Sequence, residues 1–302
     1  MMPVLASGWW LCGMAFALSV ALTWGAIAYA HHRGMLDEPG RRRSHTLPTP
    51  RGGGIGLVGG TLPSIMLAMA YWPGGSAMPV VAAFGVAGLL VALTGWVDDH
   101  RDTGVLPRLL VQLLAAVLFS VALIHDRHMA LAWLPVGMLL AVWSINLHNF
   151  MDGIDGLLGL QILFVGIGLG VLAWVLAQPA LAVAAFGMAA ACCGFLLFNR
   201  PPARIFMGDV GSGFAGFLVF ALIALLVTRV RLALWPALIL CSAFVIDAGL
   251  TLAWRMYSGK RWYTAHREHL YQWLVRCGHS HARVGGFYLL WNLLLAAPVA
   301  AW

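Results

Sequence analysis

Charged side chains are scarce in this sequence. Asp, Glu, Lys and Arg together make up 10% of the 302 residues, whereas hydrophobic residues make up 61%. Soluble domains are roughly 45–50% apolar and about 25% charged, and a globule of this length has too little interior to bury so much apolar surface. The shortage of charge therefore excludes a soluble protein and predicts an integral membrane protein.

Cysteine is also scarce, and its pattern excludes two kinds of small stabilised domain. The five cysteines are an odd number, Cys192 and Cys193 are adjacent, and four of the five lie in apolar runs. A disulfide framework or a zinc knuckle would need regular spacing, so we interpret these cysteines as small core residues. The first ten residues also lack the basic region and cleavage motif of a secretory signal, so we expect the first apolar run to be retained as a span.

Ten apolar runs are long enough to cross a bilayer, which takes about 20 residues each. They predict an all-α, polytopic single domain over residues 1–302, with spans at 8–30, 53–72, 78–97, 108–124, 130–148, 157–177, 179–198, 211–228, 233–254 and 284–302. The substantial loops between them lie at 31–52, 98–107, 149–156, 199–210 and 255–283. Because consecutive spans alternate in direction, we expect all of these loops on one face.

Orientation in the membrane explains the net charge of +7 better than nucleic acid does. All of the 18 basic residues except Arg127, Arg229 and Arg231 fall on the loop-rich face. By the positive-inside rule this face is cytoplasmic, which places both termini outside the cytoplasm. We therefore expect no nucleic-acid partner.

Acidic residues gather on the same face, although the positive-inside rule does not require it. Of the eleven Asp and Glu residues, only Asp126 lies opposite and only Asp247 lies inside a span. The gathering is therefore a separate indication of a functional site. An ionisable residue within a span is a functional candidate by default, but Asp247 could equally pair with Arg255, so its role stays open.

Three carboxylates lie where helices are expected to end or begin. Asp98 and Asp99 close the third span, where the helix dipole makes two negative charges unfavourable, and a divalent cation is the usual partner of clustered carboxylates. Asp209 precedes the small residues of FMGDVGSG at the start of the eighth span. A helix N-terminus with small residues is a natural anion site, and a carboxylate beside it would hold a metal rather than the anion itself. We predict all three as metal ligands and catalytic residues; a solvated charge cluster and a helix N-cap are the alternatives.

The stretch NLHNFMDGIDGL carries Asn146, Asn149, Asp152 and Asp155 at spacings of three. If this segment stays helical, the four groups share one face, and its glycines let a ligand approach the backbone closely. A polar turn at a helix end is the alternative. We predict Asp152 as catalytic and the other three as substrate-binding.

Two basic clusters flank these acidic motifs. They comprise Arg51 with Ser44 and His45, and His266 with Arg267 and His269. Arg51 opens a glycine-rich run that would suit either an anion cradle or close helix packing. The histidine cluster is not HExxH, which argues against a zinc protease, and it suits phosphate neutralisation or anionic lipid.

Five motifs in this order resemble those of the polyprenyl-phosphate N-acetylhexosamine-1-phosphate transferases, in glycosyltransferase family 4. They are SHTLPTPRGGG, Asp98-Asp99, NLHNFMDGIDGL, FMGDVGSG and AHREHL, and the resemblance covers nearly the whole chain. The last motif is most similar to the subgroup that initiates O-antigen or other surface polysaccharides. The resemblance implies transfer of an N-acetylated sugar 1-phosphate from a UDP-sugar to undecaprenyl phosphate, with release of UMP, in the bacterial inner membrane. It also implies Mg²⁺ or Mn²⁺ as cofactor.

The resemblance further implies roles for individual residues. Asp209 would ligate Mg²⁺ beside Asp98 and Asp99, Asn149 and Asp152 would line the site, Asp155 and Phe206 would contact the uracil, and His266, Arg267 and His269 would hold phosphates. A phosphate monoester has a second pKa of about 6, so the lipid phosphate is already largely a dianion. We therefore expect Asp98 and Asp99 to act through metal and positioning, with proton removal secondary.

Two other functions compete with this interpretation. The stretch from Asp98 to Asp102 reads as DDxxD, which would suit a Mg²⁺-dependent intramembrane prenyltransferase, but FMGDVGSG and the histidine loop would then have no role. A transporter would require charges at the bilayer midplane and inverted repeats, and the sequence shows no repeat. Loop 255–283 is where we expect the sugar to be selected, and a homodimer is an alternative to a monomer.

Overall fold

The computed structural model describes residues 8–37, 48–101, 103–260 and 267–301. Over these residues the expected all-α, multi-pass architecture is confirmed, since nine helical runs are long and apolar enough to cross a membrane. They are α2 (Trp9–Arg33), α3 (Gly54–Tyr71), α4 (Met78–His100), α5 (Val105–Asp126), η1 with α6 (Leu131–Trp133 and Leu134–Phe150), α7 (Leu157–Val175), α8 (Pro179–Asn199), α9 (Asp209–Arg229), and a last run that begins with α13 (His281–Trp291).

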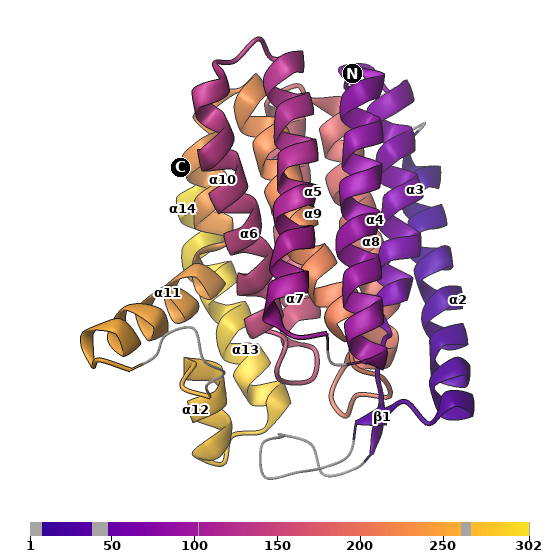
Figure 1. Cartoon of the computed structure of the whole chain (residues 1–302), viewed down its shortest axis with the longest axis vertical. Coiled ribbons are helices and arrows are strands. Elements are labelled where there is room, and N and C mark those ends of the chain that lie inside the picture. The colour runs from indigo at the N-terminus through magenta and orange to yellow at the C-terminus, as the bar shows by residue number, and fades with distance from the viewer. Residues whose placement is uncertain (1–7, 38–47, 102, 261–266, 302) are drawn as a thin grey trace.

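The span predicted at 233–254 is not one straight helix. After the short η2 (Arg231–Ala233), it consists of α10 (Leu234–Leu240) and α11 (Ser242–Tyr257), with a 73° bend between them. Figure 1 shows α11 leaving the bundle sideways. Apolar composition indicates a preference for the bilayer but not straightness, and α11 carries two buried charged residues, Asp247 and Arg255, that contact the segment following it.

The end of the chain also departs from the prediction in detail. A short helix, α12 (Leu270–Arg276), lies in the predicted loop 255–283. The last span begins at His281 rather than at 284, because Ser280 caps α13 by accepting a hydrogen bond from the Arg283 amide. It then passes through a π-helical turn, η3 (Asn292–Ala296), into α14 (Ala297–Ala301).

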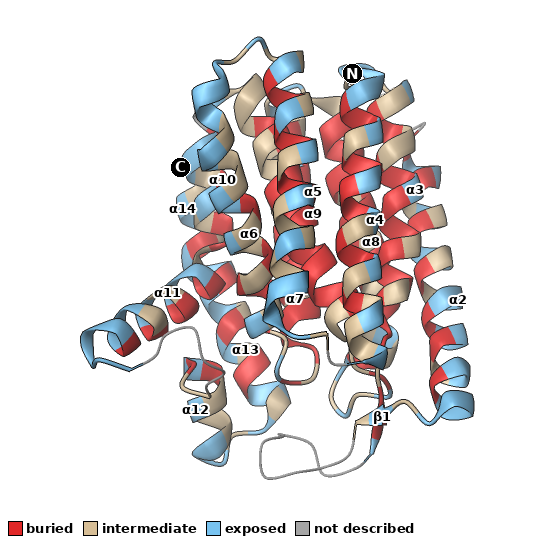
Figure 2. Ribbon diagram, viewed as in Figure 1, coloured by how far each residue is buried: buried red, intermediate tan, exposed pale blue. Residues whose placement is uncertain are grey.

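Small residues hold the helices close together. The helices α2, α3, α7 and α8 pack as one group, and α4, α5 and α6 pack with α9 as another. A Cβ at Gly56 would come within 2.0 Å of Thr23 Oγ1, and one at Gly60 within 2.5 Å of the Ala15 carbonyl oxygen. Helix packing therefore accounts for these glycines of the glycine-rich motif, as in other small-residue membrane interfaces. Figure 2 shows the buried residues on the inward faces of the helices.

The sequence motifs meet at one end of the bundle. The ends of α4 and α6, the start of α9 and a small hairpin all lie there, at the bottom of Figure 1. The hairpin was not predicted; β1 (Leu36–Asp37) pairs antiparallel with β2 (Thr49–Pro50) inside the loop 31–52. The predicted gathering of these loops on one face is thus confirmed for the described residues.

Candidate active site

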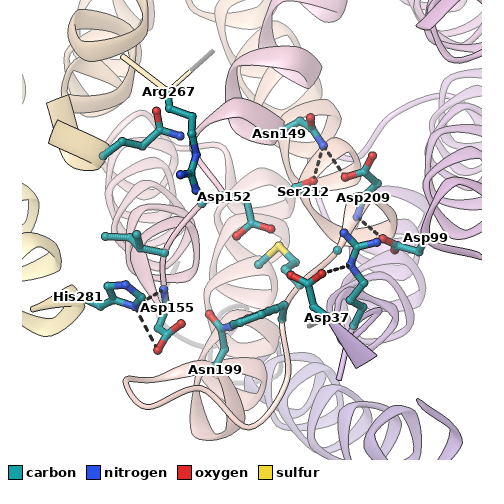
Figure 3. Close-up of a pocket in the computed structure, with 17 residues that line it drawn as sticks. Asp37, Asp99, Asn149, Asp152, Asp155, Asn199, Asp209, Ser212, Arg267 and His281 are labelled. Carbon is teal, nitrogen blue, oxygen red and sulfur yellow. Dashed lines mark hydrogen bonds and ion pairs between the residues drawn. The ribbon is translucent and has the colours of Figure 1, made fainter. Parts of the chain in front are cut away.

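A polar cavity of about 290 Å³ opens at this end of the bundle. It brings together eight of the residues predicted from sequence: Arg51, Asp99, Asn149, Asp152, Asp155, Phe206, Asp209 and Arg267. The remaining lining residues, which were not predicted individually as site residues, are Asp37, Gly153, Ile154, Asn199, Met207, Gly208, Ser212, Gln272 and His281. Figure 3 shows Asp152 near the centre, between the Asn149–Asp209 side and the Asp155–His281 side.

Asp99 joins the end of α4 to the start of α9. Its two carboxylate oxygens accept hydrogen bonds from the backbone amides of Asp209, at 3.0 Å, and Val210, at 3.1 Å. These amides belong to the first turn of α9 and would otherwise lack helical partners. The approach requires glycine at position 208, where φ is +74° and a Cβ would lie 2.5 Å from an Asp99 oxygen.

Arg108 lies between the other two predicted metal ligands. Its Nη1 donates to Asp98 Oδ2 and to Asp209 Oδ2, at 2.8 Å in each case. Asn149 fixes the other oxygen of Asp209, because its Nδ2 donates to Asp209 Oδ1 at 3.0 Å. An arginine from the start of α5 therefore supplies part of the positive charge that was expected beside the adjacent carboxylates.

The donor set at this place fits a hard divalent cation. Among the described residues, no group of three His, Cys, Asp or Glu side chains could hold a metal ion by itself. Mg²⁺ usually needs only one or two carboxylates and takes its other oxygens from water and substrate phosphates. Asp98 and Asp209 already share one cationic group, so they are the pair best arranged to hold such an ion, with Asp99 adjacent.

Asp152 lies in the turn after α6, so the helix does not extend to it as the spacing suggested. Burial, together with repulsion from Asp209, Asp99 and Asp155, raises the pKa of its carboxyl to about 8. A carboxyl group in such a position favours its neutral form until a cation arrives. Arg267 lines the same cavity from the segment that precedes α12.

Asp155 is held from two directions on the opposite side of the cavity. Its Oδ2 accepts the Ala203 amide at 3.1 Å and lies 3.3 Å from His281 Nδ1. Asn199 supports the same turn, because its Oδ1 accepts the Gly156 amide at 3.0 Å. No local pattern predicts Asn199 or His281 at this site, because Asn199 lies 43 residues from Gly156 along the chain and His281 lies 126 residues from Asp155.

The structure places other predicted residues away from the cavity wall. Asn146 joins α6 to α5, with its Nδ2 donating to Gln112 Oε1 at 2.8 Å. His269 is buried beside Asp247, and its ring stacks on Tyr271 with 5.9 Å between centroids. Asp98 contacts the site through Arg108 and does not line the cavity. The remaining predictions, Ser44, His45 and His266, lie outside the described residues.

Known proteins are similar in sequence to this chain. Residues 81–228 match the family model described as glycosyl transferase family 4. The decaprenyl-phosphate N-acetylglucosaminephosphotransferase of Mycolicibacterium smegmatis is 29% identical, covering 93% of this chain and 76% of the relative. The phospho-N-acetylmuramoyl-pentapeptide-transferase of Synechococcus sp. (strain JA-2-3B'a(2-13)) is 32% identical, covering 79% of this chain and 72% of the relative.

The chain belongs to the polyprenyl-phosphate hexosamine phosphotransferase family. The segment that matches glycosyl transferase family 4 runs from α4 to the end of α9 and includes Asp98, Asp99, Asp152 and Asp209. Membership disfavours the prenyltransferase interpretation of DDxxD. In addition, Asp99 accepts backbone amides of α9 whereas Asp98 accepts from Arg108, so the two carboxylates are held by different partners.

Proposed function

We propose that this protein transfers an N-acetylated sugar 1-phosphate from a UDP-sugar to undecaprenyl phosphate. The products are undecaprenyl-diphospho-sugar and UMP, and the step initiates O-antigen or another surface polysaccharide. The observation that carries the proposal is the cavity at the end of a membrane bundle, where acidic and basic groups from distant segments meet. The family relatives, which are named as transferases acting with a polyprenyl phosphate or a muramoyl-pentapeptide, support it.

In the proposed reaction an oxygen of the lipid phosphate attacks the phosphorus that bears the sugar. A new P–O bond forms, the P–O bond to UMP breaks, and UMP leaves with the bonding pair. The attacking phosphate is largely a dianion near neutral pH because its second pKa is about 6, so catalysis rests on positioning and charge neutralisation. This supports a positioning role for Asp98 and Asp99, with proton removal secondary.

In this proposal the charged residues have different roles. Mg²⁺, for which Mn²⁺ could substitute, would be held by Asp209 and Asp98 with Asp99 adjacent, and it would neutralise charge on the diphosphate. Arg267 and Arg51 line the cavity and would orient phosphate oxygens, a task suited to the planar guanidinium. Phe206 and Asp155, also in the wall, would contact the uracil.

The proposed setting is the bacterial inner membrane, with the cavity facing the cytoplasm and both termini on the other side. The distribution of Arg and Lys supports this orientation, because the topology predicted from the sequence assigns 15 of the 18 basic residues, all except Arg127, Arg229 and Arg231, to the loops that carry the motifs. The UDP-sugar would then be available from the cytoplasm and undecaprenyl phosphate from the bilayer. Both substrates would reach the same end of the bundle.

The decisive experiment presents the purified protein with undecaprenyl phosphate, Mg²⁺ and a panel of UDP-sugars, and measures UMP release. We expect release with at least one UDP-N-acetylated sugar, its loss on chelation by EDTA, and recovery with Mg²⁺. Asp209→Asn should lower kcat by about 100-fold or more. Asp126→Asn is the matched control, since Asp126 pairs with Arg127 at the other end of the bundle. Folded protein that releases no UMP from any of the sugars would contradict the proposal.

A further inference from the structure

Asp247 is a buried carboxylate that the proposed chemistry does not use. It lies in α11, is 5% exposed, and does not line the cavity. Arg255, the partner that the sequence suggested, pairs instead with Glu268, at 3.0 Å. The carboxylate of Asp247 faces α12 and α13, and it accepts hydrogen bonds from Thr251, Leu270, Tyr271 and Tyr288.

The hydrogen bonds of Asp247 fasten three elements together. Its oxygens accept the backbone amides of Leu270, at 2.8 Å, and Tyr271, at 3.4 Å, which open α12. The hydroxyl of Tyr288, in α13, donates to the same carboxylate. The first amides of a helix lack partners within it, so Asp247 caps α12 from a different helix.

The first turn of α12 in turn supports the loop that carries Asp152. Tyr271 is 1% exposed, and its hydroxyl donates to the Phe150 carbonyl oxygen at 2.9 Å. Its ring lies so close to the backbone of this loop that a Cβ on Gly153 would fall 2.1 Å from the Tyr271 oxygen. The next residue, Gln272, donates to that oxygen at 3.1 Å and lines the cavity.

We propose that Asp247 is a positioning residue for the active site. It holds α12 so that Tyr271 fixes the turn bearing Asp152 and Gly153, while Arg267 and Gln272 keep their places in the cavity wall. The inference rests on the proposed function for its kinetic consequence, but not for its structural one. A carboxylate suits this place because it accepts from several donors at once, whereas an amide would turn its own NH₂ group toward one of them.

The test compares Asp247→Ala and Asp247→Asn with Ser242→Ala. Ser242 is also in α11 and accepts from Trp291 Nε1 at 3.0 Å, so its variant removes a polar contact to the last helical run without touching α12. We expect Asp247→Ala to lower kcat/KM by about 100-fold, as small displacements of positioning groups do. Asp247→Asn should lose less, and Ser242→Ala should stay within about twofold of wild type.

Hydrogen exchange provides the readout that does not depend on catalysis. In the Asp247 variants the amides of residues 270–276 should exchange faster, while those of α4 and α9 keep their wild-type protection. If Asp247→Ala does not fold, Asp247→Asn decides the question by the same measurement. Unchanged exchange in a folded variant would overturn the proposal, whether or not its activity has fallen.

A double-mutant cycle tests the route through Tyr271. Tyr271→Phe removes the hydrogen bond to Phe150, and we expect Asp247→Asn to cost less activity in that background than in wild type, since both act on one contact. If the activity losses of the two single variants simply multiply in the double variant, Asp247 does not act through Tyr271. If the wild-type protein releases no UMP, the proposed function fails, but faster exchange of α12 in Asp247→Asn would still show that Asp247 holds this helix.

Discussion

At the scale of single residues, the candidate site contains more aspartates than arginines, so its negative charge is only partly neutralised. Six aspartates lie in or directly beside the cavity: Asp37, Asp98, Asp99, Asp152, Asp155 and Asp209. The arginines in or directly beside the cavity, within the described residues, are Arg51, Arg108 and Arg267. Asp152 shows the consequence most directly, because burial and neighbouring carboxylates raise the pKa of its carboxyl to about 8.

This raised pKa predicts how the stability of the metal-free protein depends on pH. In the unfolded chain the Asp152 carboxyl should titrate near pH 3.9, so the folded state binds its proton more tightly. The resulting stabilisation is complete below about pH 4 and is lost as pH rises to about 8. We therefore expect the Tm of EDTA-treated protein in detergent to fall between pH 6 and pH 8.5, and Asp152→Asn to reduce that fall.

Asp126→Asn is the control for the pH experiment, since it removes a carboxylate far from the cavity and should keep the wild-type slope. If the Tm of Asp152→Asn fell with pH as steeply as that of wild type, other titrating groups would be the cause of the fall in Tm. The comparison needs only thermal unfolding, so it does not depend on the identity of the substrate.

The chemical types at the site could be predicted from sequence, but their pairings could not. Asp98, Asp99 and Asp209 stood out because carboxylates at helix ends are rare in so apolar a chain. Arg108 did not, although it lies ten residues from Asp98, since an arginine at the start of a membrane helix has an ordinary explanation in membrane orientation. The connection from Asp155 to His281 joins residues 126 apart, and no local pattern reports on such a contact.

At the scale of helices, hydropathy predicted where the spans lie because each needs about 20 apolar residues. It could not predict the 73° bend between α10 and α11. The two helices together are apolar enough for a membrane, and α11 makes tertiary contacts, such as those of Asp247 with α12, that no local pattern predicts. The short helix α12 was missed for the same reason, because its N-terminus is capped from another element.

Close packing of α2 against α3 gives a testable element-scale prediction. A methyl group at position 56 would collide with Thr23 Oγ1 and the Ser19 carbonyl oxygen, so Gly56→Ala should destabilise the protein by about 1–3 kcal/mol through overpacking. Gly25→Ala, in α2, is the matched control, because no heavy atom lies within 4 Å of the added Cβ. Alanine is the better helix former, so this control should keep or slightly raise the Tm in detergent.

Thermal unfolding of the two variants, each against wild type, distinguishes packing from helix propensity. If Gly56→Ala proved as stable as Gly25→Ala, the close approach of α2 and α3 would not be a constraint on the fold. The expected order is Gly56→Ala below wild type, with Gly25→Ala at or above it.

At the scale of the whole molecule, the bundle has one chemically elaborate end and one plain end. The polar cavity and the motif loops occupy the first, and the connection between α5 and α6 lies at the second (Figure 1). In our proposal the elaborate end faces the cytoplasm. This orientation follows from the distribution of basic residues and is independent of the details of the site.

Cysteine labelling tests the orientation. Cys277 is exposed just after α12 at the elaborate end, and the other four cysteines are buried or partly buried. A membrane-impermeant maleimide should label Cys277 in inside-out vesicles and not in intact cells stripped of the outer membrane. His128→Cys in a Cys277→Ala background, placed after α5 at the opposite end, should show the reverse. Labelling of Cys277 from outside would invert the proposed topology.

Because Asp99 caps α9, the two aspartates of the Asp98-Asp99 doublet make different kinds of contact. Position 99 must present two acceptors to the backbone of another helix, because the amides of Asp209 and Val210 have no helical partner of their own. Within the described residues, Asp98 accepts hydrogen bonds from the Arg108 side chain and from the hydroxyl and amide of Thr103, five residues along the chain. The two aspartates therefore differ in their contacts: Asp99 joins α4 to α9 through the backbone, whereas Asp98 shares Arg108 with Asp209, the pair that would hold the cation in our proposal.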